Sequence, residues 1–122
     1  MNFQTMYNEK LTSAEDAVKV VNSGDWVDYG WCTGTPVALD AAMAKRLPEL
    51  TDVNFRGGIL MHVPEIFKID SPAQHMTWNS WHMGGIERKA IAQNFSFYNP
   101  IRYSELPRYY RDSATPSRVA MF

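Results

Sequence analysis

"DWVDYGWCTGTPVALDAAMAKRL", residues 25–47, is the stretch of sequence that decides the fold. Its first eight residues are rich in aromatic and β-branched side chains, which predicts a strand. In the remainder, Leu39, Met43 and Leu47 recur every four residues, which predicts an amphipathic helix over 33–47. A strand that passes through a glycine turn into a helix is the repeating unit of parallel α/β sheets.

Helices and strands alternate on both sides of this stretch. Before it, the pattern of residues 12–24 predicts a helix, with Ser13 and Asp16 as a capping box, an apolar repeat over 14–21, and Gly24 as the stop. The later segments predict strands over 52–61 and 74–82. They also predict a helix from Gly85, with Ile86, Ala90 and Ile91 on one face. A short strand and loop follow within 94–103, and then a helix capped by Ser104 with Pro107 in its first turn. We therefore predict an α/β fold with a mostly parallel sheet flanked by helices.

Composition limits both the size and the class of the protein. With 122 residues, 45% of them hydrophobic, the chain can bury one core. Its net charge is −1, and its twelve Lys and Arg are scattered, so no nucleic-acid partner is expected. A single cysteine, no signal-peptide pattern and no apolar run of about 20 residues favour a cytoplasmic protein that does not enter membranes.

The last residues, "SRVAMF" (117–122), predict a buried strand. No sequence follows to cover or pair it, and an exposed apolar edge promotes aggregation. Two readings are about equal on these grounds: a fragment of a longer polypeptide, or a natural C-terminal strand that pairs at the sheet centre.

Two glycine turns are the candidate binding sites. In the first, Gly30 and Gly34 free the backbone, Thr33 and Thr35 supply hydroxyl groups, and Thr35 is expected to cap a helix that begins at Pro36. Backbone N–H groups at such turns bind anions, at the edge where open α/β sheets bind ligands. The alternative is purely structural, because strand-to-helix turns need glycines and caps in any case.

The second turn repeats this arrangement. Asn79, Ser80, His82 and the N–H groups of Gly84 and Gly85 are expected to face one crevice, with Arg88 placed to bind a carboxylate or phosphate. The alternative is that the neighbouring tryptophans belong to the core or an interface, and that Arg88 lies on a solvated helix face.

No residue of the chain carries a catalytic or metal-binding motif. The three histidines have no Cys or carboxylate at ligand spacing, so no metal is expected. Cys32 beside the first turn could be a nucleophile, but a lone cysteine at a strand end is more often an inert small hydrophobe.

Four segments resemble one enzyme family when they are taken in order: residues 23–46, 50–61, 78–89 and 99–112. They are similar to the N-terminal part of the butyryl-CoA:acetate CoA-transferases, within the acetyl-CoA hydrolase/transferase family. The resemblance covers about residues 7–122 and is closer to this branch than to the 4-hydroxybutyrate CoA-transferases. Gly84 departs from it, since relatives can carry serine there.

The resemblance implies a two-domain α/β enzyme of which this chain is the N-terminal part, truncated at Phe122, with the C-terminal domain missing. Such enzymes are cytoplasmic homo-oligomers of fermenting bacteria. They transfer coenzyme A between acyl-CoA and a short-chain carboxylate through a glutamyl-CoA thioester. They need no cofactor beyond the CoA thioester substrate.

The resemblance also places the nucleophilic glutamate in the second domain, beyond Phe122. No catalytic residue is therefore expected in this chain, which alone is predicted to be inactive. The two glycine turns are expected to line the substrate crevice, and loss of the Arg88 side chain to weaken turnover or carboxylate affinity. Two other functions stay open: acyl-CoA hydrolysis within the same family, and a non-catalytic module that binds a partner through its Trp-rich strand.

Overall fold

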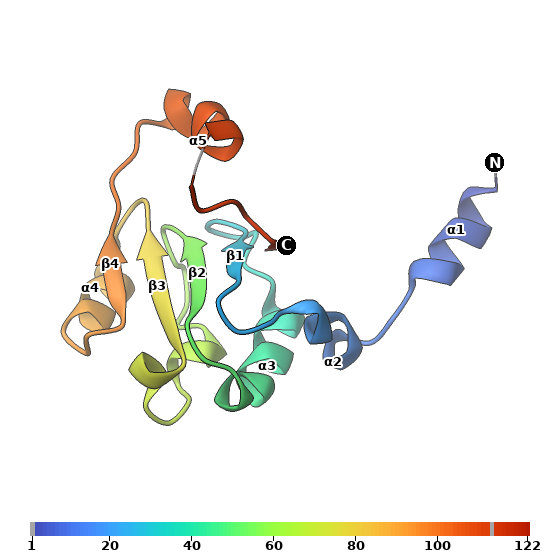
Figure 1. Ribbon diagram of the computed structural model, residues 1–122, viewed down its shortest axis with the longest axis horizontal. Helices are drawn as coiled ribbons and strands as arrows, with labels where there is room; N and C mark the ends of the chain where they lie inside the picture. Colours follow the sequence, from blue (N-terminus) through green and yellow to red (C-terminus); the bar gives the residue numbers. More distant parts are fainter. Residues whose placement is uncertain (1, 113) are drawn as a thin grey trace.

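The computed structural model describes residues 2–112 and 114–122, and its centre is a five-stranded sheet in which all neighbouring strands are parallel (Figure 1). The strand order is β4-β3-β2-β1-β5. The strands are β1 (Trp26–Tyr29), β2 (Val53–Gly57), β3 (Met76–Ser80), β4 (Ser96–Tyr98) and β5 (Val119–Met121). The predicted fold class and each predicted strand are confirmed.

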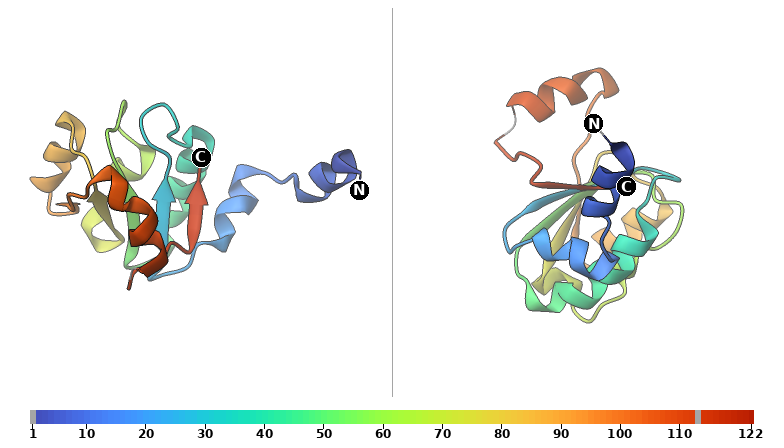
Figure 2. Two further views of the ribbon diagram at one scale, coloured as in Figure 1. Left: turned by 90° about the horizontal axis from the view of Figure 1, so that it is seen from above. Right: turned by 90° about the vertical axis from the view of Figure 1, so that its right-hand side faces the viewer.

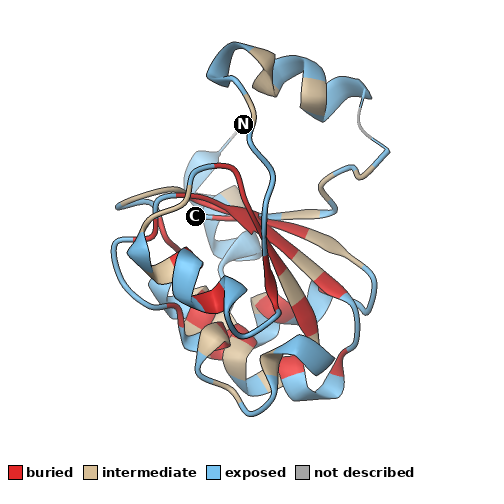
Figure 3. Ribbon diagram, turned by 90° about the vertical axis from the view of Figure 1, so that its left-hand side faces the viewer, coloured by how far each residue is buried: buried red, intermediate tan, exposed pale blue. Residues whose placement is uncertain are grey.

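Helices cover the two faces of the sheet unequally. One face carries α2 (Ala14–Ala17), α3 (Val37–Arg46) and α4 (Gly85–Ile91), whereas α5 (Leu106–Asp112) lies on the other side (Figure 2). Short 3-10 helices extend this framework at Val18–Val20, Leu47–Glu49, Glu65–Phe67, Pro72–Gln74 and Tyr103–Glu105. Buried residues gather in the strands and in the helices beside them, while α5 carries exposed and half-buried residues (Figure 3).

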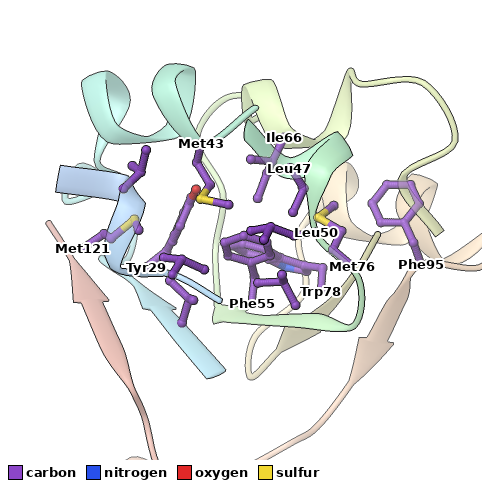
Figure 4. Packing of buried hydrophobic residues seen from close by; sticks show 14 of the residues in the cluster. Tyr29, Met43, Leu47, Leu50, Phe55, Ile66, Met76, Trp78, Phe95 and Met121 are labelled. Carbon is purple, nitrogen blue, oxygen red and sulfur yellow. The ribbon is translucent and has the colours of Figure 1, made fainter. Parts of the chain in front are cut away.

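The core lies between the sheet and α3. Alternate residues of the strands point to this face because side chains alternate along a strand. Tyr29, Phe55 and Trp78, one from each central strand, are buried and pack edge to face, with Tyr29 ring centroids 5.3 Å from Phe55 and 5.7 Å from Trp78. Met43 and Leu47 cover them from the α3 side (Figure 4).

The opposite face of the sheet is polar. Asp28 pairs in register with Arg56, and Arg56 with Asn79, so the three side chains form a row across β1, β2 and β3. Thr77 donates a hydrogen bond to Asn54 (2.8 Å), beside this row. We call the face formed by Asp28, Asn54, Arg56, Thr77 and Asn79 the polar face.

The helix predicted over residues 12–24 starts as predicted but ends early. The Ser13 hydroxyl accepts the Asp16 N–H (3.0 Å), as expected of an N-cap. The α-helix then ends at Ala17 and continues as a 3-10 turn to Val20. Gly24 was wrongly predicted as the helix stop: it lies in the following turn with φ 83°, where its N–H bonds to the Thr51 carbonyl.

Three further details differ from the sequence-based predictions. Ser104 is not an N-cap, because it lies inside the 3-10 turn that leads into α5. Ile91 is 41% exposed, so the buried face of α4 is formed by Glu87 and Ala90 with the half-buried Ile86. The C-terminal strand does pair, with β1, but at the sheet edge instead of its centre.

Helix α1 (Phe3–Lys10) stands away from the rest of the molecule (Figure 1). The Asn2 side chain caps it by accepting the N–H of Gln4 (3.1 Å). The sequence analysis did not predict this helix, which has no buried residue. In the part of the chain that the structure describes, neither α1 nor any other helix has the length and apolar character needed to cross a bilayer.

Candidate functional site

The parallel sheet brings three chain turns to one edge. β1, β2 and β3 all run in the same direction, and Gly57 pairs in register with Ser80. The turns that follow these strands therefore begin side by side, at the edge where α/β proteins bind ligands. Both predicted glycine turns lie here.

The first turn is shaped by a close approach of its two glycines. The Gly34 N–H donates to the Trp31 carbonyl (2.7 Å), and a Cβ on Gly30 would lie 2.1 Å from the Gly34 oxygen. Glycine is therefore required at position 30 on steric grounds, whether or not the turn binds a ligand. Thr33 and Gly34 are exposed.

The predicted helix cap in this turn is wrong. The buried Thr35 hydroxyl donates back to the Cys32 carbonyl (3.0 Å) and caps nothing. Pro36 occupies the N-cap position without a side-chain cap, and the helix begins at Val37. Cys32 has a positive φ (52°), and Thr35, three residues later, is buried.

In the second turn, internal hydrogen bonds occupy several of the predicted groups. Ser80 is fully buried, and its hydroxyl donates to the His82 carbonyl (2.8 Å). The Gly84 N–H donates to Glu87 Oε2 (2.9 Å). Arg88 is exposed, with Nη2 3.4 Å from the Met83 carbonyl oxygen. Its role in carboxylate binding stays a prediction.

Aromatic rings connect the two turns. The Trp31 ring centroid lies 5.4 Å from that of Trp81 and 5.6 Å from that of the exposed His82. The turn after β2 joins them, because the Ile59 N–H donates to the His82 carbonyl (3.0 Å) and Leu60 forms a bridge with Cys32. Three separate chain turns thus form one surface.

A crevice of about 600 Å³ opens beside this surface, between the first glycine turn and α5. We call it the α5 crevice. Its lining is mainly apolar and aromatic. The lining residues are Asp28, Tyr29, Gly30, Trp31, Gly34, Trp81, Tyr103, Leu106, Tyr110, Ser117, Ala120 and Phe122.

The predicted site residues do not all meet in this crevice. Gly30 and Gly34 line it, whereas His82 does not and instead packs against the ring of Trp31. Gly85 instead lines a second groove of about 480 Å³ between α4 and the loop that contains Val63 and Phe67. None of the predicted residues of the second glycine turn, namely Ser80, His82, Gly84, Gly85 and Arg88, lines the α5 crevice.

The sequence analysis missed a buried ion pair beneath the α5 crevice. Arg56 Nε lies 2.5 Å from Asp28 Oδ1 and Arg56 Nη2 lies 3.2 Å from Oδ2. Burial acts to lower the pKa of Arg56, but the hydrogen bonds and charge of Asp28 outweigh it and raise the pKa, so the guanidinium stays charged. The sequence did carry a signal for this pair: a charged residue within each of two otherwise largely apolar strands, Asp28 in β1 and Arg56 in β2.

A second buried carboxylate, that of Asp40, hydrogen-bonds to groups from two other elements of the core. Asp40 of α3 accepts the N–H of Glu65 (2.6 Å) and the hydroxyl of Tyr29 (3.3 Å). Burial raises the pKa of Asp40, while these hydrogen bonds act against the rise. Burial and the Asp40 charge raise the pKa of Tyr29 well above its usual value, so Tyr29 stays protonated.

Glu87, also missed, ties two of the turns together. It is fully buried, and its carboxylate accepts the N–H of Leu60 (2.9 Å) as well as that of Gly84. In the sequence, Glu87 shows only the general preference for a negative charge near a helix N-terminus, which does not identify a partner in another turn. Across residues 2–112 and 114–122, no three His, Cys, Asp or Glu side chains are grouped so that they could hold a metal ion.

Comparison with known proteins gives the family. Residues 1–117 match the acetyl-CoA hydrolase/transferase N-terminal domain. The chain belongs to the acetyl-CoA hydrolase/transferase family. This confirms the resemblance drawn from the four sequence segments.

The relatives support the predicted branch of the family. The chain is 63% identical over 121 residues to the butyryl-CoA:acetate CoA-transferase of Anaerostipes caccae and 41% identical over 115 residues to a probable butyrate:acetyl-CoA coenzyme A-transferase of Syntrophomonas wolfei. Identity to the 4-hydroxybutyrate coenzyme A transferase of Clostridium kluyveri is 26%. These matches take in 99%, 94% and 99% of this chain but 27%, 26% and 28% of the relatives. The chain thus spans about a quarter of their length.

Solved structures agree on the fold. RipA from Yersinia pestis superposes with a TM-score of 0.80 at 21% identity, over 95% of this chain and 29% of RipA. A 4-hydroxybutyrate CoA-transferase from Porphyromonas gingivalis gives a TM-score of 0.58 at 18% identity, over 98% of this chain and 26% of that protein. At these identities the likeness concerns the fold alone.

Proposed function

We propose that this chain is the N-terminal part of a CoA-transferase that moves coenzyme A between butyryl-CoA and acetate. The observation that carries the proposal is the 63% identity to the Anaerostipes caccae enzyme over 99% of this chain. The α5 crevice suits the substrate role, because aromatic and apolar walls accept a short acyl chain at the edge of the sheet where such folds bind ligands.

The proposed reaction proceeds through a glutamate in the portion of the relatives that this chain does not span. Its carboxylate attacks the thioester carbonyl of butyryl-CoA, and the CoA thiolate leaves as an acyl-glutamyl anhydride forms. The thiolate then attacks the glutamyl carbonyl, which releases butyrate and leaves a glutamyl-CoA thioester. Acetate reverses these steps and departs as acetyl-CoA.

Within this scheme the described residues bind and shape, and none acts as the nucleophile. The N–H groups of Gly84 and Gly34 are already bonded, to Glu87 and to the Trp31 carbonyl, so the exposed backbone of the first turn gives the site its shape and neither glycine supplies a free donor. Trp31 and Trp81 form an apolar wall beside it.

A chimeric enzyme tests the proposal. The matching quarter of the Anaerostipes caccae enzyme is replaced by this chain, and acetyl-CoA formation from butyryl-CoA and acetate is followed by chromatography. We expect acetyl-CoA from the chimera and none from the 122-residue chain alone. Intact mass spectrometry of the chimera, incubated with butyryl-CoA without acetate, should show a covalent CoA adduct.

Each other outcome identifies a different function. Free CoA without any need for acetate would make the protein a hydrolase. A folded chimera without turnover would favour a non-catalytic binding module. Turnover by the 122-residue chain alone would place the nucleophile within it.

The proposal includes the cellular compartment and the oligomeric state of the enzyme. Following the resemblance, we propose a cytoplasmic homo-oligomer completed by a C-terminal domain. Light scattering on the chimera, compared with the parent enzyme, tests the oligomeric part: equal molar masses support it, and a monomeric chimera that still turns over contradicts it.

A further inference from the structure

The Asp28–Arg56 ion pair is unusual because it is buried in the middle of the sheet. The two residues face each other across β1 and β2, and their side chains are 10% and 1% exposed. A buried ion pair contributes little net stability, since the cost of removing both charges from water offsets their attraction. Its presence needs another explanation.

The remaining polar groups of the pair bond to one segment beyond the sheet. Arg56 Nη1 donates to the Thr115 carbonyl (2.9 Å) and to the Tyr109 hydroxyl (3.4 Å). The Tyr110 hydroxyl is hydrogen-bonded to Asp28. Both members of the ion pair therefore hold the segment that contains α5.

Aromatic packing strengthens this attachment. The Arg56 Cζ atom lies 5.4 Å from the ring centroids of both Tyr109 and Tyr110, within the range of cation–π attraction. Trp26 and Trp81 contribute two further rings from the sheet side, at 5.0 and 5.6 Å. The guanidinium thus lies between rings of the sheet and rings of α5.

The segment held in this way forms one wall of the α5 crevice. Tyr103, Leu106 and Tyr110 line the crevice opposite Gly30 and Trp31. A displacement of α5 would therefore change the width of the crevice, while the apolar core on the other face of the sheet would stay in place.

We infer that Arg56, fixed by Asp28, is a positioning residue that holds α5 against the polar face and so sets the width of the α5 crevice. The attachment of α5 is independent of any activity. Its consequence for turnover rests on the proposed CoA-transferase function.

Hydrogen exchange of the 122-residue chain tests the attachment. Arg56→Lys keeps the charge beside Asp28 but loses the planar group that reaches Tyr109 and Thr115. Asp28→Leu/Arg56→Met removes both charges together, so neither is left buried and unpaired. In both variants we expect the amides of residues 106 and 108–112 to exchange at least about tenfold faster, with β1 and β2 amides unchanged.

Arg111→Met, a change at an exposed arginine of α5 itself, is the matched control and should leave exchange unaltered. Unchanged exchange of residues 106–112 in both test variants would overturn the inference. Equal acceleration in β1 and β2 would also overturn it, because the pair would then stabilise the sheet without a specific role toward α5.

The same variants, made in the chimera, test whether the attachment of α5 affects substrate binding. We expect Arg56→Lys to raise the KM for butyryl-CoA about tenfold or less while kcat changes little, since a wider crevice weakens binding without touching the nucleophile. If α5 is released and the kinetics do not change, the positioning role stands and the α5 crevice is not the substrate site. If exchange does not change, the positioning role fails whatever the kinetics.

Discussion

Gly30 illustrates how one residue of the candidate site is fixed by packing. Any Cβ at this position meets the carbonyl oxygen of Gly34, a backbone atom that cannot move aside. We predict that Gly30→Ala lowers the free energy of unfolding by about 2–4 kcal/mol, measured by urea denaturation. Gly85→Ala is the matched control: a Cβ there meets nothing within 4 Å, and alanine favours the helix, so stability should rise by up to about 1 kcal/mol. Equal effects at both positions would contradict the steric argument.

Asp40 gives a pH dependence whose sign follows from its burial. Because burial raises its pKa above 3.8, the folded protein holds this proton more tightly than the unfolded chain does. The stability that Asp40 contributes is therefore present at low pH and is lost as the pH rises through the folded pKa. Relative to Asp40→Asn, we expect the free energy of unfolding to fall as the pH increases from about 4 toward neutrality.

Urea denaturation of both proteins across this pH range measures the difference directly. A difference that grows with pH would mean that the hydrogen bonds from Glu65 and Tyr29 outweigh the burial of the carboxylate.

At the scale of elements, Glu87 joins the turn after β2 to the start of α4. Glu87→Ala would leave the N–H groups of Leu60 and Gly84 without their acceptor in a buried environment. We predict a loss of about 3 kcal/mol in the free energy of unfolding, with faster exchange of these two amides. Glu87→Gln keeps the shape but accepts at one end, and should lose less.

Glu105→Ala serves as the control for this prediction. Glu105 pairs with Arg108 on the surface of the molecule, and such exposed pairs contribute little, so no measurable change is expected. Protection of the Leu60 and Gly84 amides that survives in Glu87→Ala would show that other groups hold the two turns together.

The elements themselves were largely predictable, and the reason is their periodicity. The apolar repeat of α3 and the β-branched and aromatic runs of β1 and β2 reflect burial that recurs along each element. Helix ends were less predictable: Gly24 lies beyond the end of its helix, where its N–H bonds to Thr51, and Thr35 bonds to Cys32 instead of capping α3. Helix α1 has no buried residue and was missed.

The candidate site was predictable in part, where it depends on local sequence. Glycine turns at strand ends are visible in sequence, so Gly30 and Gly34 were found. The pairing of Asp28 with Arg56 depends on which strands are neighbours and in what register, and that information lies in the assembled sheet. The same holds for the bonds from Glu87 to Leu60 and Gly84, which link turns distant in sequence.

At the scale of the whole molecule, the two faces of the sheet differ in kind. Parallel sheets are usually apolar on both faces because helices cover both. Here one face holds the core, and the polar face carries a hydrogen-bonded series in which Asn99 donates to Asn79, Asn79 to Thr77, and Thr77 to Asn54. A sheet with this asymmetry can keep its core intact while the contacts on its polar face change, which is what the two tests of Arg56 require.

The pairing of β1 with β5 has a consequence for biosynthesis. Val27 is hydrogen-bonding neighbour to Val119, yet a ribosome makes β1 early and β5 after every other strand of the sheet. Until residues 119–121 emerge, the outer side of β1 offers unpaired backbone groups to any other nascent chain. The described sheet is therefore completed beside β1 only when residues 119–121 emerge, and in the interval before this, pairing of β1 with another chain competes with folding.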